Sequence, residues 1–360
     1  MQRTELAIIG AGCAGLTAAI EAAGAGVQAT LIDEHARPGG QLFKQIHKFF
    51  GSHAHLAGVR GNDIAQCLLD ECRDLDVRVL LSTVAYGIFP DRLIGLGTPA
   101  GVDELRAERI IIATGASEDP LAFPGWTLPG VMGAGAAQTI MHVHRVLPGR
   151  RVLIVGAGNV GLIVGFQLRQ AGAEVVALVE ATEHVTGYMI HAAKLMRTGV
   201  PILLRHTVAE AGGNGKVERA VVRQLDHGGG EPLTFDVDCI CIAVGLSPLV
   251  ELAHMAECRL AYVPELGGHV PLHDENMETS VRSIYVAGDL AGVEEANTAM
   301  DEGRLAGVAA AESLGKLDAA PAAERKERIR ERLAALRLGP FGGHRQAAKN
   351  RLMAILRSLR

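Results

Sequence analysis

The feature that most constrains this sequence is a pattern of strand, glycine loop and acid that occurs twice. The two copies begin Leu6-Ala7-Ile8-Ile9-Gly10-Ala11-Gly12-Cys13-Ala14-Gly15 and Val152-Leu153-Ile154-Val155-Gly156-Ala157-Gly158-Asn159-Val160-Gly161. Each loop opens a helical stretch, and a β-branched strand ending in an acid follows. Asp33 lies 18 residues after Gly15, and Glu180 lies 19 residues after Gly161. The repeat predicts an α/β fold with two βαβ units.

Each glycine has a separate role in such a loop. The first (Gly10, Gly156) permits a tight turn, the second (Gly12, Gly158) lets the backbone approach a pyrophosphate, and the third (Gly15, Gly161) lets helix and strand pack closely. The acid at the strand end accepts hydrogen bonds from a ribose diol. Glu180 therefore favours NAD(H) over NADP(H) at the second loop. Glycine-rich turns that bind no ligand are the alternative.

Composition narrows the class of protein. The 360 residues predict two domains, and 48% hydrophobic with 21% charged residues excludes a disordered chain. A net charge of -5 and 4% aromatic residues give no reason to expect nucleic acid binding. The sequence shows no apolar run of membrane-spanning length, and we expect no cleavable leader. Six cysteines without a CxxC pair indicate reduced thiols, so we expect a cytoplasmic protein without a metal site.

The charge is distributed unevenly along the chain. Residues 321–360 carry a net charge of +8, whereas residues 1–320 carry -13. The positions Leu352, Ile355, Leu356 and Leu359 form an apolar stripe with helical spacing. We expect a basic helical tail that docks on an acidic or apolar surface. Three surfaces stay open for its stripe: the body of the same chain, a partner subunit and an anionic membrane.

The order of further motifs resembles the superfamily of thioredoxin reductase and glutathione reductase, flavoproteins with two dinucleotide-binding domains. The matching segments, after the first loop and Asp33, are Pro38-Gly39-Gly40-Gln41-Leu42, Ala113-Thr114-Gly115 and Ile284-Tyr285-Val286-Ala287-Gly288-Asp289. The resemblance implies an FAD domain formed by residues 1–120 and 250–320, with an NAD(P)-type domain at 121–249 and the tail at 321–360. It also implies that the helix around 295–307 directs its amino end at the flavin.

The resemblance assigns cofactor-binding residues at two sites. For FAD these are Gly10, Gly12, Gly15, Asp33, Gly40, Gln41, Val84, Thr114, Gly115, Gly288 and Asp289. For the second nucleotide they are Gly156, Gly158, Gly161 and Glu180. Some relatives hold ATP or ADP at the second site, so that alternative stays open.

The redox dithiol of the disulfide reductases is missing from this sequence. Residues 41–45, which follow the Gly39-Gly40 pair, contain no cysteine, and neither do residues 130–138 before the second loop. A segment without thiols cannot relay electrons to a disulfide. We therefore expect an oxidoreductase that is not a disulfide reductase, and we assign no catalytic side chain.

A narrower resemblance rests on three segments, Phe123-Pro124-Gly125-Trp126-Thr127-Leu128-Pro129-Gly130-Val131, residues 133–138 and Asp274-Glu275-Asn276-Met277-Glu278-Thr279. These are similar to the flavoprotein subunits of heteromeric amine and amino-acid dehydrogenases, which include hydrogen cyanide synthase, opine oxidase and the D-hydroxyproline or proline dehydrogenases. The resemblance implies that the partner is a second FAD-containing subunit. Because residues 321–360 contain no cysteine, we expect any iron–sulfur cluster on another, small chain.

Two alternatives to this function remain. The chain could be a stand-alone NADH-dependent flavin reductase or dehydrogenase, or a non-catalytic assembly subunit that holds FAD and ADP. The segment 44–60, which contains His47, His53 and His55, is interpreted as a substrate or partner contact or a solvated loop, with a metal site as the weaker alternative.

Overall fold

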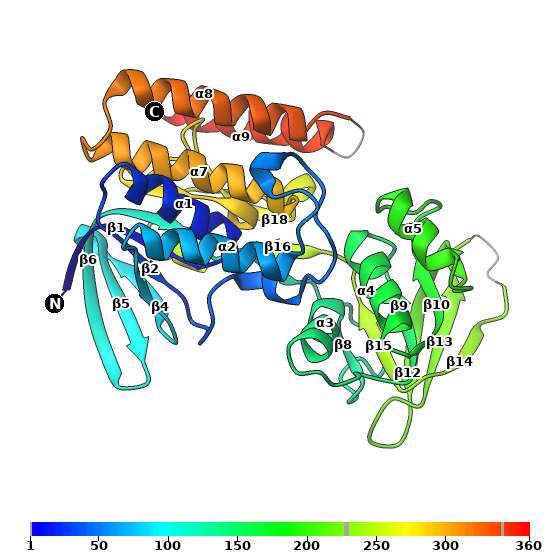
Figure 1. The fold of residues 1–360 in the computed structure, drawn as a ribbon. Helices are drawn as coiled ribbons and strands as arrows, with labels where there is room; N and C mark the ends of the chain where they lie inside the picture. Colours follow the sequence, from blue (N-terminus) through cyan, green and yellow to red (C-terminus); the bar gives the residue numbers. More distant parts are fainter. Residues whose placement is uncertain (1, 227–229, 340–341) are drawn as a thin grey trace. The chain divides into compact units, whose positions relative to one another are not determined.

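The computed structural model describes residues 2–226, 230–339 and 342–360, and its chain forms two compact units (Figure 1). Unit 1 combines Met1–Ser117 with Ser247–Arg360, and unit 2 is Glu118–Leu246. The chain passes from one unit to the other through β7 (Ala116–Glu118) and returns through β16 (Leu246–Pro248), and these short strands pair with each other.

The sheet of unit 1 has a parallel part and an antiparallel extension. Its strands run in the order β3-β2-β1-β6-β5-β4, with β19 also paired to β6. The bounds are β1 Gln2–Ile9, β2 Ala29–Ile32, β3 Arg78–Leu80, β4 Val84–Phe89, β5 Leu93–Thr98, β6 Gly101–Ile112 and β19 Ile284–Val286. Strand β1 lies parallel to β2 and β6, and β19 is parallel to β6. The carboxyl ends of these four strands therefore meet at one edge of the sheet.

Helices α1 (Cys13–Gly24) and α7 (Ala296–Ser313) pack closely in unit 1. Glycines make this approach possible: a Cβ atom on Gly303 or Gly307 would collide with backbone oxygens of α1. The other elements of the unit are α2 Gly61–Asp74, α6 Glu251–Met255, β17 Leu260–Val263, β18 Gly268–Pro271 and the 3-10 turns η1 Gly40–Lys44, η2 His53–His55, η3 Pro90–Arg92, η4 Pro264–Leu266 and η5 Gly288–Ala291.

The basic tail forms two helices, α8 (Ala319–Leu336) and α9 (Gly343–Leu359), which run antiparallel above α7 (Figure 1). Helix α8 buries Ile329 and Leu333 in the main core of unit 1. Helix α9 buries Leu352 and Leu356 in a smaller core around η4 and β18. Of the three surfaces that the sequence left open, the body of the same chain covers these two leucines, and docking on a partner does not apply to them. Ile355 (43% exposed) and Leu359 (48% exposed) remain accessible.

Unit 2 contains a parallel sheet in the order β11-β10-β9-β15-β8 and an antiparallel sheet, β12-β13-β14. Its strands are β8 Val131–Gly133, β9 Arg151–Val155, β10 Glu174–Glu180, β11 Ile202–Leu204, β12 His206–Gly212, β13 Arg219–Gln224, β14 Leu233–Asp236 and β15 Cys239–Ile242, and its helices are α3 Ala134–His142, α4 Asn159–Gln170 and α5 Met189–Met196.

Side-chain alternation along β9 explains the layers of unit 2. Val152 and Ile154 pack against helices α3, α4 and α5, whereas Leu153 and Val155 pack against the antiparallel sheet. Both faces of this strand are buried, which is typical of a parallel sheet covered on both sides. The predicted class, α/β with two Rossmann-like sheets and a helical tail, is confirmed. Among the described residues, no helix is long and apolar enough to cross a membrane.

Candidate cofactor sites

The first glycine loop connects β1 to α1 in the geometry that its sequence predicts. Gly10 has a φ of +105°, and a Cβ atom there would collide with the carbonyl oxygen of Ala113. A Cβ on Gly15 would collide with the Gly10 oxygen. Gly12 differs, because a Cβ there would meet nothing within 4 Å. The space beside Gly12, at the amino end of α1, can therefore receive an anionic group.

The Asp33 carboxylate locks this loop to the end of β2. Its Oδ2 accepts a hydrogen bond from the Ala11 N–H (2.7 Å), and its Oδ1 accepts one from the His35 N–H (2.8 Å). Asp33 is 7% exposed. Buried carboxylates need such partners, because an unpaired one is costly. The carboxylate therefore stands at the rim of the loop, where the pattern predicts a ribose.

The other segments assigned to FAD converge on the same edge of the sheet. A Cβ on Gly40 would lie 2.8 Å from the Gly12 Cα, and one on Gly288 would lie 2.8 Å from the Ala14 Cβ. Thr114 and Gly115 follow β6 after one residue, Ala113, and Thr114 Oγ1 donates to the Leu249 carbonyl oxygen (2.9 Å).

Two assigned residues lie at the margin of this group. Gln41 is exposed in η1. Val84 begins β4 and is 45% exposed, although the preceding Thr83 N–H donates to the backbone carbonyl oxygen of Asp33 (2.9 Å). Both residues lie in segments near the loop, but their side chains are exposed.

Asp289 lies in the turn η5, just before α7, with several other acidic side chains around it. Burial, together with the charges of Glu302, Glu295 and Glu294, raises the pKa of Asp289 to about 7. Its Oδ1 accepts a long hydrogen bond from the Glu294 N–H (3.4 Å). The amino end of α7 lies beside the first loop, because Cys13 Sγ is 3.7 Å from the Ala296 oxygen. The late motif and the first loop thus form one region of unit 1.

The second glycine loop repeats this geometry in unit 2. Gly156 has a φ of +109°, and a Cβ there would collide with the Ala243 oxygen. A Cβ on Gly161 would collide with the Gly156 oxygen, whereas one on Gly158 would find only Thr186 Oγ1, 3.9 Å away. The backbone at Gly158, like that at Gly12, is therefore open to close approach by another group.

Glu180 locks the second loop as Asp33 locks the first. Its Oε2 accepts from the Ala157 N–H (2.7 Å), and its Oε1 accepts from the Thr182 N–H (3.0 Å). Like Asp33, Glu180 is 7% exposed. The same two-ended arrangement on both sheets follows from the repeated sequence.

Two further glycines contact the loops: Gly39, which lies in one of the matched segments, and Gly187, which was not predicted from the sequence. The Gly39 N–H donates to the Ala11 oxygen (2.7 Å), and the Gly187 N–H donates to the Ala157 oxygen (2.9 Å). A Cβ on Gly187 would lie 2.8 Å from the Asn159 nitrogen. Gly187 follows Glu180 by seven residues, and Gly39 follows Asp33 by six. Extending the repeat beyond the acids would have revealed Gly187.

None of the six cysteines is placed to act as a redox dithiol. All six are free thiols. Burial and the nearby Asp289 raise the pKa of Cys13 to about 12, so that its thiol stays protonated. Cys239 and Cys241 have their sulfurs 3.8 Å apart, but both side chains are fully buried in β15.

The histidine-rich segment serves a structural purpose at one of its histidines. The buried His55 has its Nε2 2.9 Å from Asp301 Oδ2, and its Nδ1 2.9 Å from Ser52 Oγ. Across the described parts of the chain, no cluster of three His, Cys, Asp or Glu side chains could hold a metal ion.

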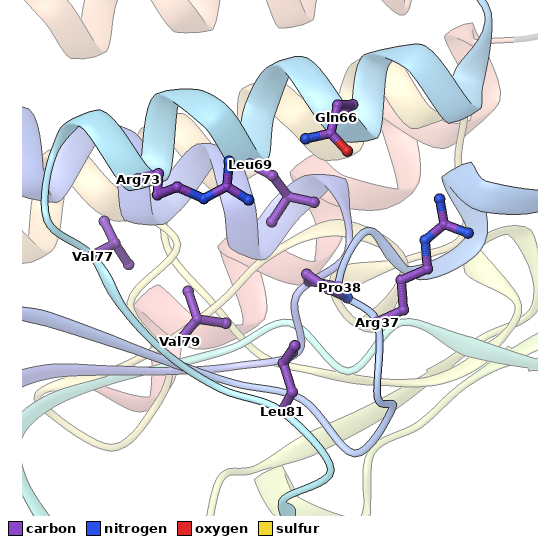
Figure 2. Close-up of a pocket in the computed structure, with 8 residues that line it drawn as sticks. All are labelled: Arg37, Pro38, Gln66, Leu69, Arg73, Val77, Val79 and Leu81. Atoms are coloured by element: carbon purple, nitrogen blue, oxygen red, sulfur yellow. The ribbon is translucent and has the colours of Figure 1, made fainter.

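A hollow also opens between α2 and β3 (Figure 2). Figure 2 shows apolar side chains between the helix and the strand, with two arginines at the margin; the lining is Arg37, Pro38, Gln66, Leu69, Arg73, Val77, Val79 and Leu81. None of these residues belongs to the assigned cofactor sets. Arg73 is paired with Asp70 (2.7 Å) on the same helix, which makes it a surface ion pair.

Comparison with known proteins identifies the family. The profile of the pyridine nucleotide-disulphide oxidoreductases matches residues 4–303, which include all of unit 2 and much of unit 1. The chain belongs to this family. It is an FAD-dependent oxidoreductase of that family in which no cysteine occupies the positions of the redox dithiol.

Among the curated relatives of this oxidoreductase are subunits of heteromeric oxidases and synthases. An opine oxidase subunit of Agrobacterium tumefaciens (strain Ach5) is 28% identical over 85% of this chain and 65% of its own length. Hydrogen cyanide synthase subunit HcnB of Pseudomonas aeruginosa is 28% identical over 92% of this chain and 75% of its own length. The chain thus spans about two thirds to three quarters of these relatives.

A solved structure supports the fold of the oxidoreductase. The L-proline dehydrogenase from P. horikoshii superposes with a TM-score of 0.70 at 24% identity, covering 92% of this chain and 59% of that one. At this identity the likeness concerns the fold. The predicted resemblance to flavoproteins with two dinucleotide-binding domains is confirmed.

Proposed function

We propose that this oxidoreductase is the electron-transfer flavoprotein subunit of a heteromeric amine or amino-acid (imino-acid) dehydrogenase. It moves electrons between a nicotinamide nucleotide, or the flavin of a partner chain, and an acceptor. The observation that carries the proposal is the pair of glycine loops, each with a carboxylate lock and an open space at its central glycine. The names of the relatives support the heteromeric assembly.

In this proposal FAD binds in unit 1. Gly12 and the amino end of α1 hold its pyrophosphate, Asp33 accepts from a ribose hydroxyl, and Asp289 holds the ribityl and pyrophosphate region. The amino end of α7 stabilises negative charge on the reduced ring. FAD supplies hydride and single-electron transfer when it is bound. The side chains fix its position and surroundings, so that no acid, base or nucleophile is required.

The second site takes NAD(H) in unit 2. Gly158 leaves the space for phosphate, and Glu180 accepts from a free 2′-hydroxyl. The proposed partners are a small iron–sulfur protein and a second FAD-containing subunit. The cytoplasmic location expected from the free thiols stays a prediction.

Anaerobic reduction tests the proposed function. Protein purified with FAD should lose its flavin absorbance when NADH is added, and Gly158→Val should keep the FAD while losing the response. Bleaching by an amine only in the presence of a second flavin subunit would support the partner flavin as donor. A wild type that binds ADP and is bleached by neither donor would contradict the proposal and favour a non-catalytic assembly subunit.

A further inference from the structure

The tail helices carry cations into the interior of unit 1. Arg337, directly after α8, is 8% exposed, and Lys349 in α9 is 2% exposed. Charged side chains are almost never buried unless they are paired. Here the partners are two carboxylates at α7, Glu294 and Glu302, whose side chains are only 5% and 3% exposed. The tail is therefore joined to α7 by an ionic network in addition to its apolar contacts.

Glu302 connects this network to the late motif. Its Oε1 accepts from Arg337 Nη2 (2.6 Å) and from Lys349 Nζ (2.6 Å), while its Oε2 accepts from the Gly288 N–H (3.1 Å). One carboxylate thus bridges the tail and the turn that carries Asp289. Burial alone would raise the pKa of Glu302, but the charges of Lys349 and Arg337 hold it below its ordinary value.

The neighbouring Asp301 makes a similar connection to a second segment. It accepts hydrogen bonds from Nη2 (2.8 Å) and Nε (3.1 and 3.2 Å) of Arg332 in α8, and its Oδ2 lies 2.9 Å from His55 Nε2 of η2. Arg304 extends this cluster, donating to Asp301 (2.7 Å) and to the Ala54 oxygen (2.9 Å). Two adjacent carboxylates of α7 therefore connect the tail to η2 and to η5 by hydrogen bonds.

The tail cations balance a concentration of negative charge around α7. Around the amino half of α7 lie five acids: Asp289, Glu294, Glu295, Asp301 and Glu302. An anionic dinucleotide would be repelled from such a region unless cations compensated it, because charges in a poorly hydrated environment interact strongly. The cations that do so come largely from the +8 tail.

We propose that α8 and α9 are part of the flavin site, because Arg337 and Lys349 act through Glu302 as positioning residues for the Gly288–Asp289 turn and neutralise the acidic end of α7. The inference rests on the proposed binding of FAD at that turn. It assigns a role to the basic tail that the glycine loops do not imply.

The test measures FAD binding by the full-length protein. Apoprotein of the wild type, Lys349→Gln, Arg337→Gln and the double variant is titrated with FAD, well below the unfolding temperature of each. A second site in a protein typically changes the affinity of a ligand at the first by about 5- to 150-fold. The double variant should therefore bind FAD at least about ten-fold more weakly than the wild type. Arg337→Lys, which keeps the charge, should recover part of the affinity and serves as the variant that is easier to fold.

Arg351→Gln is the matched control. Arg351 lies on the same helix as Lys349 but pairs at the surface with Glu265 (2.6 Å), and its side chain is 57% exposed. Its loss should change the FAD affinity by less than about two-fold, because surface substitutions usually cost under about 0.5 kcal/mol in free energy. The visible spectrum of the bound flavin should shift in Lys349→Gln and not in Arg351→Gln.

Two outcomes separate this inference from the placement of FAD. If Asp289→Ala binds FAD weakly while the Arg337 and Lys349 variants have lower unfolding temperatures but wild-type affinity and spectrum, the tail is only structural and the inference is wrong. If Asp289→Ala retains full affinity, the proposed placement of FAD fails first.

Discussion

The two glycine loops are nearly identical in local geometry and differ in what surrounds them. Both begin with a glycine at positive φ, both leave open space at the central glycine, and both are locked by a carboxylate to the N–H of an alanine. Only the loop of unit 1 is joined by α7 and the turn at Gly288. The repeated sequence therefore builds the same glycine cradle twice, an open loop at the amino end of a helix, and the added segments distinguish one cradle from the other.

The sharpest way to break this comparison is to fill each cradle separately. Gly12 (φ -74°) and Gly158 (φ -71°) have backbone conformations that any residue can adopt, and a Cβ at Gly12 meets nothing within 4 Å. The Gly12→Val variant should therefore fold, but its affinity for FAD should fall by about 100-fold or more, equivalent to about 2.7 kcal/mol in binding free energy.

Gly158→Val should instead leave FAD in place and remove NADH binding. Flavin content and NADH titration of both variants, with circular dichroism as a folding control, check this pair. Loss of FAD in Gly158→Val, or its retention in Gly12→Val, would contradict the separate assignment of the two loops.

Removing the carboxylate locks should have a smaller effect. Glu180→Ala deletes an acceptor for the ribose diol and the partner of the Ala157 N–H. We expect NADH binding to weaken by about 1–3 kcal/mol in free energy, the usual cost of an unmet hydrogen bond. NADPH should be weakened less, since the carboxylate also repels a 2′-phosphate.

Asp33→Ala is the matched variant, and it should weaken FAD without changing NADH affinity. Calorimetric titration with each ligand distinguishes the two effects. A wild type that prefers NADPH would show that the role assigned to Glu180 is wrong.

The titration of Asp289 should make the stability of unit 1 depend on pH. The folded pKa of Asp289 is about 7, above its ordinary 3.8, so that the folded state holds this proton more tightly than the unfolded state. The contribution of Asp289 to stability therefore falls as pH rises from about 4 to 7.

Asp289→Asn removes that contribution. In denaturant unfolding of the apoprotein, we expect the unfolding free energy of the variant to rise by about 3–4 kcal/mol relative to that of the wild type between pH 4 and pH 7.5. A difference that does not change with pH would mean that Asp289 is ionised as usual in the folded chain.

The smallest expected effect concerns the thiols. Replacing all six cysteines with alanine should leave flavin content and dye reduction, with whichever donor reduces the wild type, within about two-fold of wild type, because the Cys13 thiol stays protonated and the Cys239–Cys241 pair is buried. If the variant keeps its flavin but no longer reduces the dye, at least one cysteine takes part in electron transfer and the prediction is wrong.

Sequence reasoning reached the elements whose geometry is local. A glycine at positive φ and an acid at the end of the next strand are recognisable from spacing, because each satisfies a backbone requirement within one βαβ unit. Gly187 belongs to the same local repeat as Gly39, and it was missed because the comparison of the two repeats stopped at the acids.

The role of the tail could not be predicted in this way. From the sequence, Leu352 and Leu356 make an amphipathic stripe, and neither its spacing nor its charge says which surface covers it. The fold packs both leucines against η4 and β18, and it brings Arg337 and Lys349 to Glu302, 35 and 47 residues away along the chain.

The sequence by itself therefore determined the two cradles, their acids and the absence of a dithiol at the expected positions, since these depend on residue type at short spacing. Only the tertiary structure decided that the basic tail belongs to unit 1 and that its cations compensate the acids of α7. Burial and ion pairing between distant segments arise when the chain is folded, because a charge acquires its partner and its desolvation cost from the packed surroundings rather than from its neighbours in sequence.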